Sequence, residues 1–171
     1  MKKANILALF LLVLVVQVVF VPHISIGGIQ PDLPFLVAYA AGVHWGFLRG
    51  MAAGAGLGLL VDVAGGAAVG LSAMSGMMVG AAAGLLGGHV YRPTPAVHAG
   101  GLFGSVFLGG MTTLILVQLL YSAYEWLDGM GAIVLPQTLY TVAVGLPGVL
   151  IFLYRIEKGE SVRKSREGNA A

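Results

Sequence analysis

Cysteine is absent from the 171-residue chain, and charged residues are scarce at 9% of the total. Without cysteine there is no disulfide framework, no thiolate metal site and no thiol nucleophile. Soluble domains carry about 25% charged residues, so the low charge argues against a soluble fold. The net charge of +2 is small and the basic residues do not alternate with aromatic ones, so the sequence gives no support for a nucleic-acid interface.

Sequence patterns that carry catalysis are missing as well. The four histidines, His23, His44, His89 and His98, show neither H-x-x-x-H nor H-E-x-x-H spacing. The serines have no G-x-S-x-G context, and no glycine-rich phosphate loop is present. We therefore expect no enzymatic activity, no metal site and no cofactor, and we interpret the histidines as residues near the ends of apolar segments.

Apolar sequence is what the chain has in abundance: 58% of its residues are hydrophobic and its mean hydropathy is +0.93. This composition predicts an all-α integral membrane protein with a single transmembrane domain. Six segments are predicted to span the membrane, at residues 4–21, 33–48, 50–64, 67–89, 97–121 and 132–154. A charged tail, residues 155–171, follows and is expected to fray. The second and third segments are shorter than the ~20 residues that a straight crossing needs.

The distribution of basic residues predicts the orientation of the six segments. All nine Lys and Arg residues fall before the first segment, between the second and third, between the fourth and fifth, or after the sixth. They are Lys2, Lys3, Arg49, Arg92, Arg155, Lys158, Arg163, Lys164 and Arg166. With six spans these four regions share one side of the membrane, and basic residues favour the cytoplasmic side. Both termini are therefore expected in the cytoplasm.

Residues 49–71 hold the most informative pattern. Gly50, Gly54, Gly58 and Asp62 recur at intervals of four, so they form one stripe on a helix. A glycine stripe lets a second helix approach closely. We expect a hairpin turn at Arg49-Gly50. Two interpretations of Asp62 remain open: a structural carboxylate that caps amides in the next turn, which we favour, or a functional buried acid.

Similar features mark the other segments. Small residues also recur four apart at Gly76, Gly80, Gly84 and Gly88, and at Gly101, Ser105 and Gly109. Asp32 is placed to cap the second segment, and Pro34 fits its first turn. Pro147 should kink the sixth segment.

The pattern of residues 31–71 resembles the rod shape-determining protein MreD family. The matching residues are Pro31-Asp32-Leu33, Arg49-Gly50, the run from Gly54 through Gly58 to Asp62, and Gly70-Leu71, with Pro147 before the final basic cluster. The resemblance implies a non-enzymatic component of the bacterial cytoplasmic membrane that binds MreC. It also implies a larger complex with MreB, RodA and a class B penicillin-binding transpeptidase, which builds side-wall peptidoglycan.

The same resemblance implies a fold similar to the S component of energy-coupling-factor transporters. The alternative function is therefore a vitamin-binding transporter subunit, which would need polar groups converging in the external half. Asp32, Asp62, Gln118, Gln137 and Tyr140 are the residues available for such a site.

Overall fold

The computed structural model describes residues 3–66, 68–89, 95–121 and 129–168, and these ranges are almost entirely helical. The elements are α1 (Lys3–Val15), the π-helical turn η1 (Val16–Phe20), the 3₁₀ turn η2 (Val21–Ile24), α2 (Leu33–Trp45), α3 (Phe47–Gly65), α4 (Leu71–His89), α5 (Pro95–Tyr121), the π-helical turn η3 (Met130–Val134) and α7 (Leu135–Gly168). Within the described ranges, β pairing is limited to one bridge between Ile26 and Ile29. The predicted all-helical fold is confirmed.

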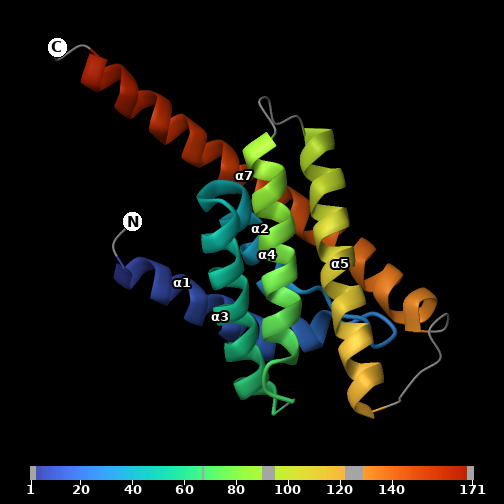
Figure 1. The fold of residues 1–171 in the computed structure, drawn as a ribbon. Coiled ribbons are helices and arrows are strands. Elements are labelled where there is room, and N and C mark those ends of the chain that lie inside the picture. Colours follow the sequence, from blue (N-terminus) through green and yellow to red (C-terminus); the bar gives the residue numbers. More distant parts are fainter. Residues whose placement is uncertain (1–2, 67, 90–94, 122–128, 169–171) are drawn as a thin grey trace.

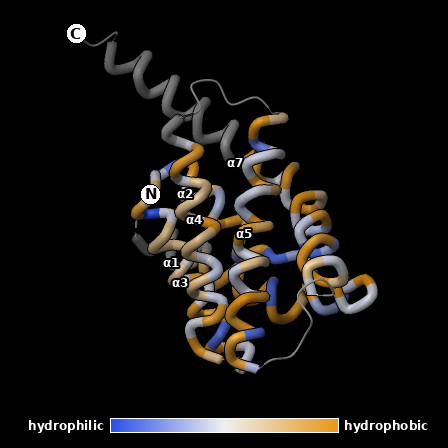
Figure 2. The backbone as a smooth tube through the Cα atoms, turned by 45° about the vertical axis from the view of Figure 1, so that its right-hand side comes forward, coloured by the Kyte–Doolittle hydropathy of each residue, from blue (hydrophilic) through white to orange (hydrophobic). Residues whose placement is uncertain are grey.

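Three helical stretches are long and apolar enough to cross a membrane: Phe47–Gly65, Ala96–Tyr121 and Met130–Ile151. Three further apolar helices are shorter, at Phe10–Ile24, Leu33–Trp45 and Leu71–Gly87. Hydrophobic residues predominate along the helices, and strongly hydrophilic ones are sparse (Figure 2). These properties are those of a helical membrane protein.

Helices α2, α3 and α4 pack side by side, α5 lies against α4, and α7 crosses behind them and extends beyond the bundle (Figure 1). The main core lies between α2, α4, α5 and α7. Phe35 and Tyr39 from α2 meet Val79 from α4, Leu102 from α5 and Val149 from α7, and each is no more than 6% exposed. The core therefore joins segments more than 100 residues apart in sequence.

The turn between α2 and α3 lies at Gly46, so the prediction of a hairpin at Arg49-Gly50 is wrong. Gly46 has φ of 83° and ψ of −179°, a conformation that only glycine adopts readily. Its N–H donates to the carbonyl of Gly42, and its own carbonyl accepts from the N–H of Gly50. Arg49 and Gly50 consequently lie in the first turn of α3.

Other predicted boundaries shift by smaller amounts. α4 begins at Leu71 rather than residue 67, because Gly66 and Gly70, with φ of 66° and 102°, form the preceding turn. α5 lies within two residues of its predicted bounds. α7 continues to Gly168, so the part of the tail that the structure describes is helical; its many Glu, Lys and Arg residues are good helix formers. The last three residues of the tail, 169–171, lie outside the described residues. Pro147 lies inside α7 without ending it.

Candidate functional site

The two predicted glycine stripes of α3 and α4 pack against each other. A Cβ on Gly50 would overlap the backbone at Gly80, and one on Gly54 would overlap the backbone at Gly76. The next position along the stripe, Gly58, lies directly against the carbonyl of Ser72. Helices whose backbones touch in this way leave no room for any side chain in the contact. The stripe glycines that the structure describes are therefore occupied by contacts between two helices of the same chain.

Helix α2 joins the same contact through Gly42, whose Cβ would lie 2.8 Å from the Cβ of Ala83 in α4. Gly84 of α4 is equally close to α3, since its Cβ would lie 2.5 Å from the Cα of Phe47. The third stripe packs as well: Gly109 lies against Val79 and Phe35. The helix contacts predicted from spacing alone are present, and their partners are elements of the same chain.

Asp62 caps the start of α4 from the end of α3. Its carboxylate accepts hydrogen bonds from the backbone N–H groups of Gly70 at 2.8 Å, Ser72 at 3.0 Å and, more weakly, Ala73 at 3.4 Å. The side chain is 0% exposed. The first N–H groups of a helix have no partner within it, and the helix dipole favours a negative charge there. This geometry matches the structural interpretation of Asp62.

Asp32 caps α2 in the predicted way, and it has further partners that the sequence did not suggest. Its Oδ1 accepts from the N–H of Phe35 at 3.1 Å, and its own N–H donates to Oγ1 of Thr141 at 3.0 Å. Gln17 fixes the same segment, accepting from the N–H of Leu33 and donating to the carbonyl of Pro31. Pro34 occupies the first turn of α2, as expected.

The pKa of the Asp32 carboxyl, which lies in the connecting segment before α2, is raised from 3.8 to about 6. Burial among apolar neighbours is the main cause, because it disfavours the charged form. The hydrogen bond from Phe35 acts in the opposite direction and is the weaker effect.

A cavity of about 150 Å³ lies beside Asp32. Its polar lining comes from Asp32 before α2, Ser72 in the first turn of α4 and Gln137 in the first turn of α7, together with Thr113 of α5. Phe35, Gly110, Leu114, Val117, Ile133 and Val134 form its apolar walls. A second cavity of about 30 Å³ lies on the other side of Asp32 and Ser72. The chain thus places polar groups from four separate elements around one space.

Comparison of the chain with models of protein families, with curated proteins and with solved structures finds no match.

The remaining candidates for an external polar site are placed elsewhere. Asp62 is fully engaged as a cap, and the hydroxyl of Tyr140 donates to the carbonyl of Ile24 at 2.8 Å. Only Asp32 and Gln137 of the predicted set line the cavity. Sequence reasoning missed Ser72, whose hydroxyl is indistinguishable in sequence from a helix-packing serine.

Two of the histidines occupy contrasting places. His98 is 8% exposed and contacts the hydroxyl of Tyr39 at 3.3 Å, so it is a core residue rather than an interfacial one. His44 is exposed at the end of α2. Within the part of the chain that the structure describes, no three His, Asp or Glu side chains gather as metal ligands would.

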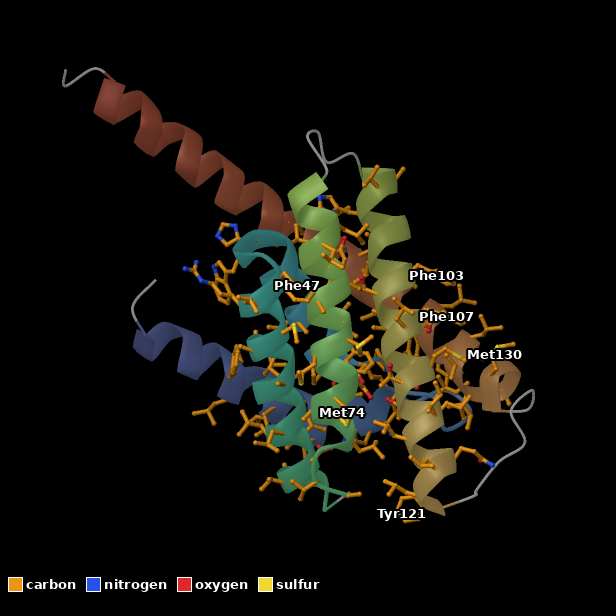
Figure 3. All side chains as sticks on the ribbon, in the orientation of Figure 1. Phe47, Met74, Phe103, Phe107, Tyr121 and Met130 are labelled. Atoms are coloured by element: carbon orange, nitrogen blue, oxygen red, sulfur yellow. The ribbon has the colours of Figure 1, made fainter. Side chains whose placement is uncertain are left out.

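The outward surface of the helices is apolar. Phe103 and Phe107 stack on the side of α5 turned away from α4, with ring centroids 6.1 Å apart (Figure 3). An apolar groove of about 210 Å³ lies between α1, α2 and α7, lined by residues that include Phe10, Leu36 and Trp45. Such surfaces suit contact with lipid or with other apolar helices.

Proposed function

We propose that the chain is a six-span protein of the bacterial cytoplasmic membrane, with both termini in the cytoplasm, that acts as an MreD-like component of the rod complex. In this role it binds MreC and supports side-wall peptidoglycan synthesis and rod shape, within a larger assembly that includes MreB, RodA and the class B penicillin-binding transpeptidase. It performs no catalysis itself.

The observation that carries the proposal is the role of the family-like residues within one three-helix unit. Asp32 caps α2 and Asp62 caps α4. Gly54 and Gly58 set the α3–α4 contact between these caps. A family motif whose members each fix the same helix arrangement is consistent with a scaffold that presents a rigid surface to partners.

The ends of the helices support the proposed orientation. The turn at Gly46, the C-terminal end of α4, the N-terminal end of α5 and the C-terminal part of α7 lie at the same end of the bundle (Figure 1). Arg49 and the basic tail belong to that end, which is therefore the proposed cytoplasmic end.

Co-expression with the MreC of the same genome tests the proposal. Purification of the tagged chain in mild detergent should recover MreC with it. Deletion of the gene should convert rods to spheres; Gly56→Ala should restore rods, and Gly54→Leu should not, because it breaks the α3–α4 contact. Persistent rods in the deletion strain together with absence of MreC from the purified sample would contradict the proposal.

The second candidate, a vitamin-binding transporter subunit, is favoured by the convergence of Asp32, Ser72 and Gln137 on one cavity. The volume of about 150 Å³ argues against it, since sites for molecules of that size usually measure about 300–1,000 Å³. Retention of a vitamin by the purified chain is the observation that would favour this candidate over the first.

A further inference from the structure

The cavity beside Asp32 combines a carboxylate with space for a small molecule. One oxygen of that carboxylate, Oδ1, is occupied by the N–H of Phe35. Among the residues that the structure describes, Oδ2 has no hydrogen-bond partner, and neither does the hydroxyl of Ser72 or the side-chain amide of Gln137. Three polar groups therefore line the cavity with hydrogen-bonding capacity left over.

The charge of Asp32 is not balanced by a basic side chain in the described structure. Arg49 is the one Lys or Arg whose side chain the structure describes, and it lies in the first turn of α3, beyond the C-terminal end of α2, whereas Asp32 caps the N-terminal end of α2. Asp32 is partly buried, and partial burial among apolar neighbours already disfavours a charge that has no positive partner. A cation entering the cavity would supply that partner.

The contrast with Asp62 shows what is unusual about Asp32. Asp62 is fully buried and has no basic partner among the residues that the structure describes, yet it accepts hydrogen bonds from the amides of Gly70, Ser72 and Ala73. Within the described residues, Asp32 accepts a single amide hydrogen bond, and it lines two cavities. The first carboxylate is satisfied by the fold, and the second is not.

The shape and lining of the cavity limit what such a cation can be. An apolar cavity of about 150 Å³ holds a molecule the size of benzene, with about six heavy atoms. Phe35, Leu114 and Val117 supply apolar wall for an alkyl group. A primary ammonium has three N–H donors, which equals the number of unoccupied acceptors on Asp32, Ser72 and Gln137.

We propose that this cavity binds a small primary alkylammonium, with its charged nitrogen on Asp32, Ser72 and Gln137 and its alkyl group against Phe35, Leu114 and Val117. The site stands whether or not the chain belongs to the rod complex.

Calorimetric titration of the purified full-length chain at pH 8 tests the site with isobutylammonium chloride. Isobutanol, which has nearly the same shape without the charge, is the matched probe, and sodium chloride controls for ionic strength. We expect isobutylammonium to bind roughly tenfold or more tightly than isobutanol, because hydrogen bonds to charged groups are the stronger ones. Equal binding of the two probes, or binding of neither, would overturn the proposal.

Variants locate the binding. Asp32→Asn keeps a good helix cap but removes the charge, and it should weaken isobutylammonium binding at least about tenfold. Val117→Phe should abolish binding by filling the cavity while Asp32 stays in place. Thr112→Ala is the control, since the Thr112 hydroxyl bonds its own helix at Leu108 and does not line the cavity.

A variant that loses its fold is recognised by its elution volume and unfolding midpoint. If the Asp32→Asn chain does not fold, Gln137→Leu tests the binding site instead, because Gln137 belongs to a different helix and its replacement removes one hydrogen-bond acceptor from the cavity. Unchanged affinity in a folded Asp32→Asn or Gln137→Leu chain refutes the assignment.

Discussion

Gly54 and Gly76 lie face to face across the α3–α4 contact, so that a Cβ on either residue would overlap the backbone carbonyl of the other. This mutual exclusion makes the contact unusually sensitive to a single methyl group. Neither backbone can withdraw alone, because Gly50 and Gly58 hold the same helix at neighbouring turns.

Gly54→Ala should therefore lower the free energy of unfolding by about 2–3 kcal/mol, the upper part of the range for overpacked sites. Gly56→Ala is the matched control on the same helix, because its Cβ would meet only the Phe10 ring at 3.7 Å. That control should be neutral or stabilising by up to about 1 kcal/mol, since alanine favours a helix over glycine. Denaturation of both variants in detergent measures the difference, and equal midpoints would contradict the close contact.

Asp62→Ala should destabilise the chain by about 2 kcal/mol or more, because it leaves buried N–H groups of the first turn of α4 without an acceptor. Asp62→Asn keeps one acceptor oxygen and should cost roughly half as much. Hydrogen exchange at Gly70 and Ser72 provides the site-specific measurement, since both amides should lose protection in the alanine variant. A stable alanine variant that nevertheless loses rod shape would instead identify Asp62 as a functional acid.

The same substitution should destabilise the chain much more at Gly46 than at Gly66. Gly66 has φ of 66° and ψ of 18°, a left-handed conformation that asparagine tolerates, so Gly66→Asn should change stability by less than about 1 kcal/mol. Gly46 combines φ of 83° with ψ of −179°, where a side chain is strained by about 1–3 kcal/mol. Gly46→Asn should therefore lower the unfolding midpoint clearly more than Gly66→Asn does. Similar midpoints for the two variants would show that the α2–α3 turn has another conformation.

The pKa of Asp32 predicts a pH dependence of stability. Because the pKa is about 6 in the folded chain and 3.8 is the ordinary value, the folded state binds the proton more tightly than the unfolded state. The stabilising contribution is fully present below pH 4 and is lost as the pH rises through 6. Asp32→Asn should lack this pH-dependent contribution. The difference in unfolding midpoint between the unsubstituted chain and Asp32→Asn should therefore change between pH 4 and pH 7. A constant difference over that range would contradict the raised pKa.

Local pattern was sufficient to predict the contact faces and the caps. The four-residue spacing of Gly50, Gly54 and Gly58 fixes one helix face whatever lies opposite, and an acid before Pro34 is a recognisable start of a helix. The turn between α2 and α3 was misplaced because Arg49 suggests a polar turn. The conformation at Gly46 depends instead on how closely Gly42 and Gly50 approach each other, which no local pattern reveals.

The cavity could not be predicted for a different reason. Ser72 and Gln137 lie 65 positions apart, and they line the same space as Asp32 only because α4 and α7 start at the same end of the bundle. Side chains brought together by the packing of whole helices leave no signal in their own segments. The small volume that they enclose depends on the sizes of Leu114, Val117 and Val134 together.

The cap that α3 supplies to α4 has a consequence for the order in which the chain assembles. Until residues 70–73 form the first turn of α4, Asp62 has no amide donors, and a lone carboxylate in lipid is costly. In the membrane location that we propose, α3 would pay that penalty if it were inserted by itself. We expect α3 and α4 to leave the translocation machinery as a paired hairpin.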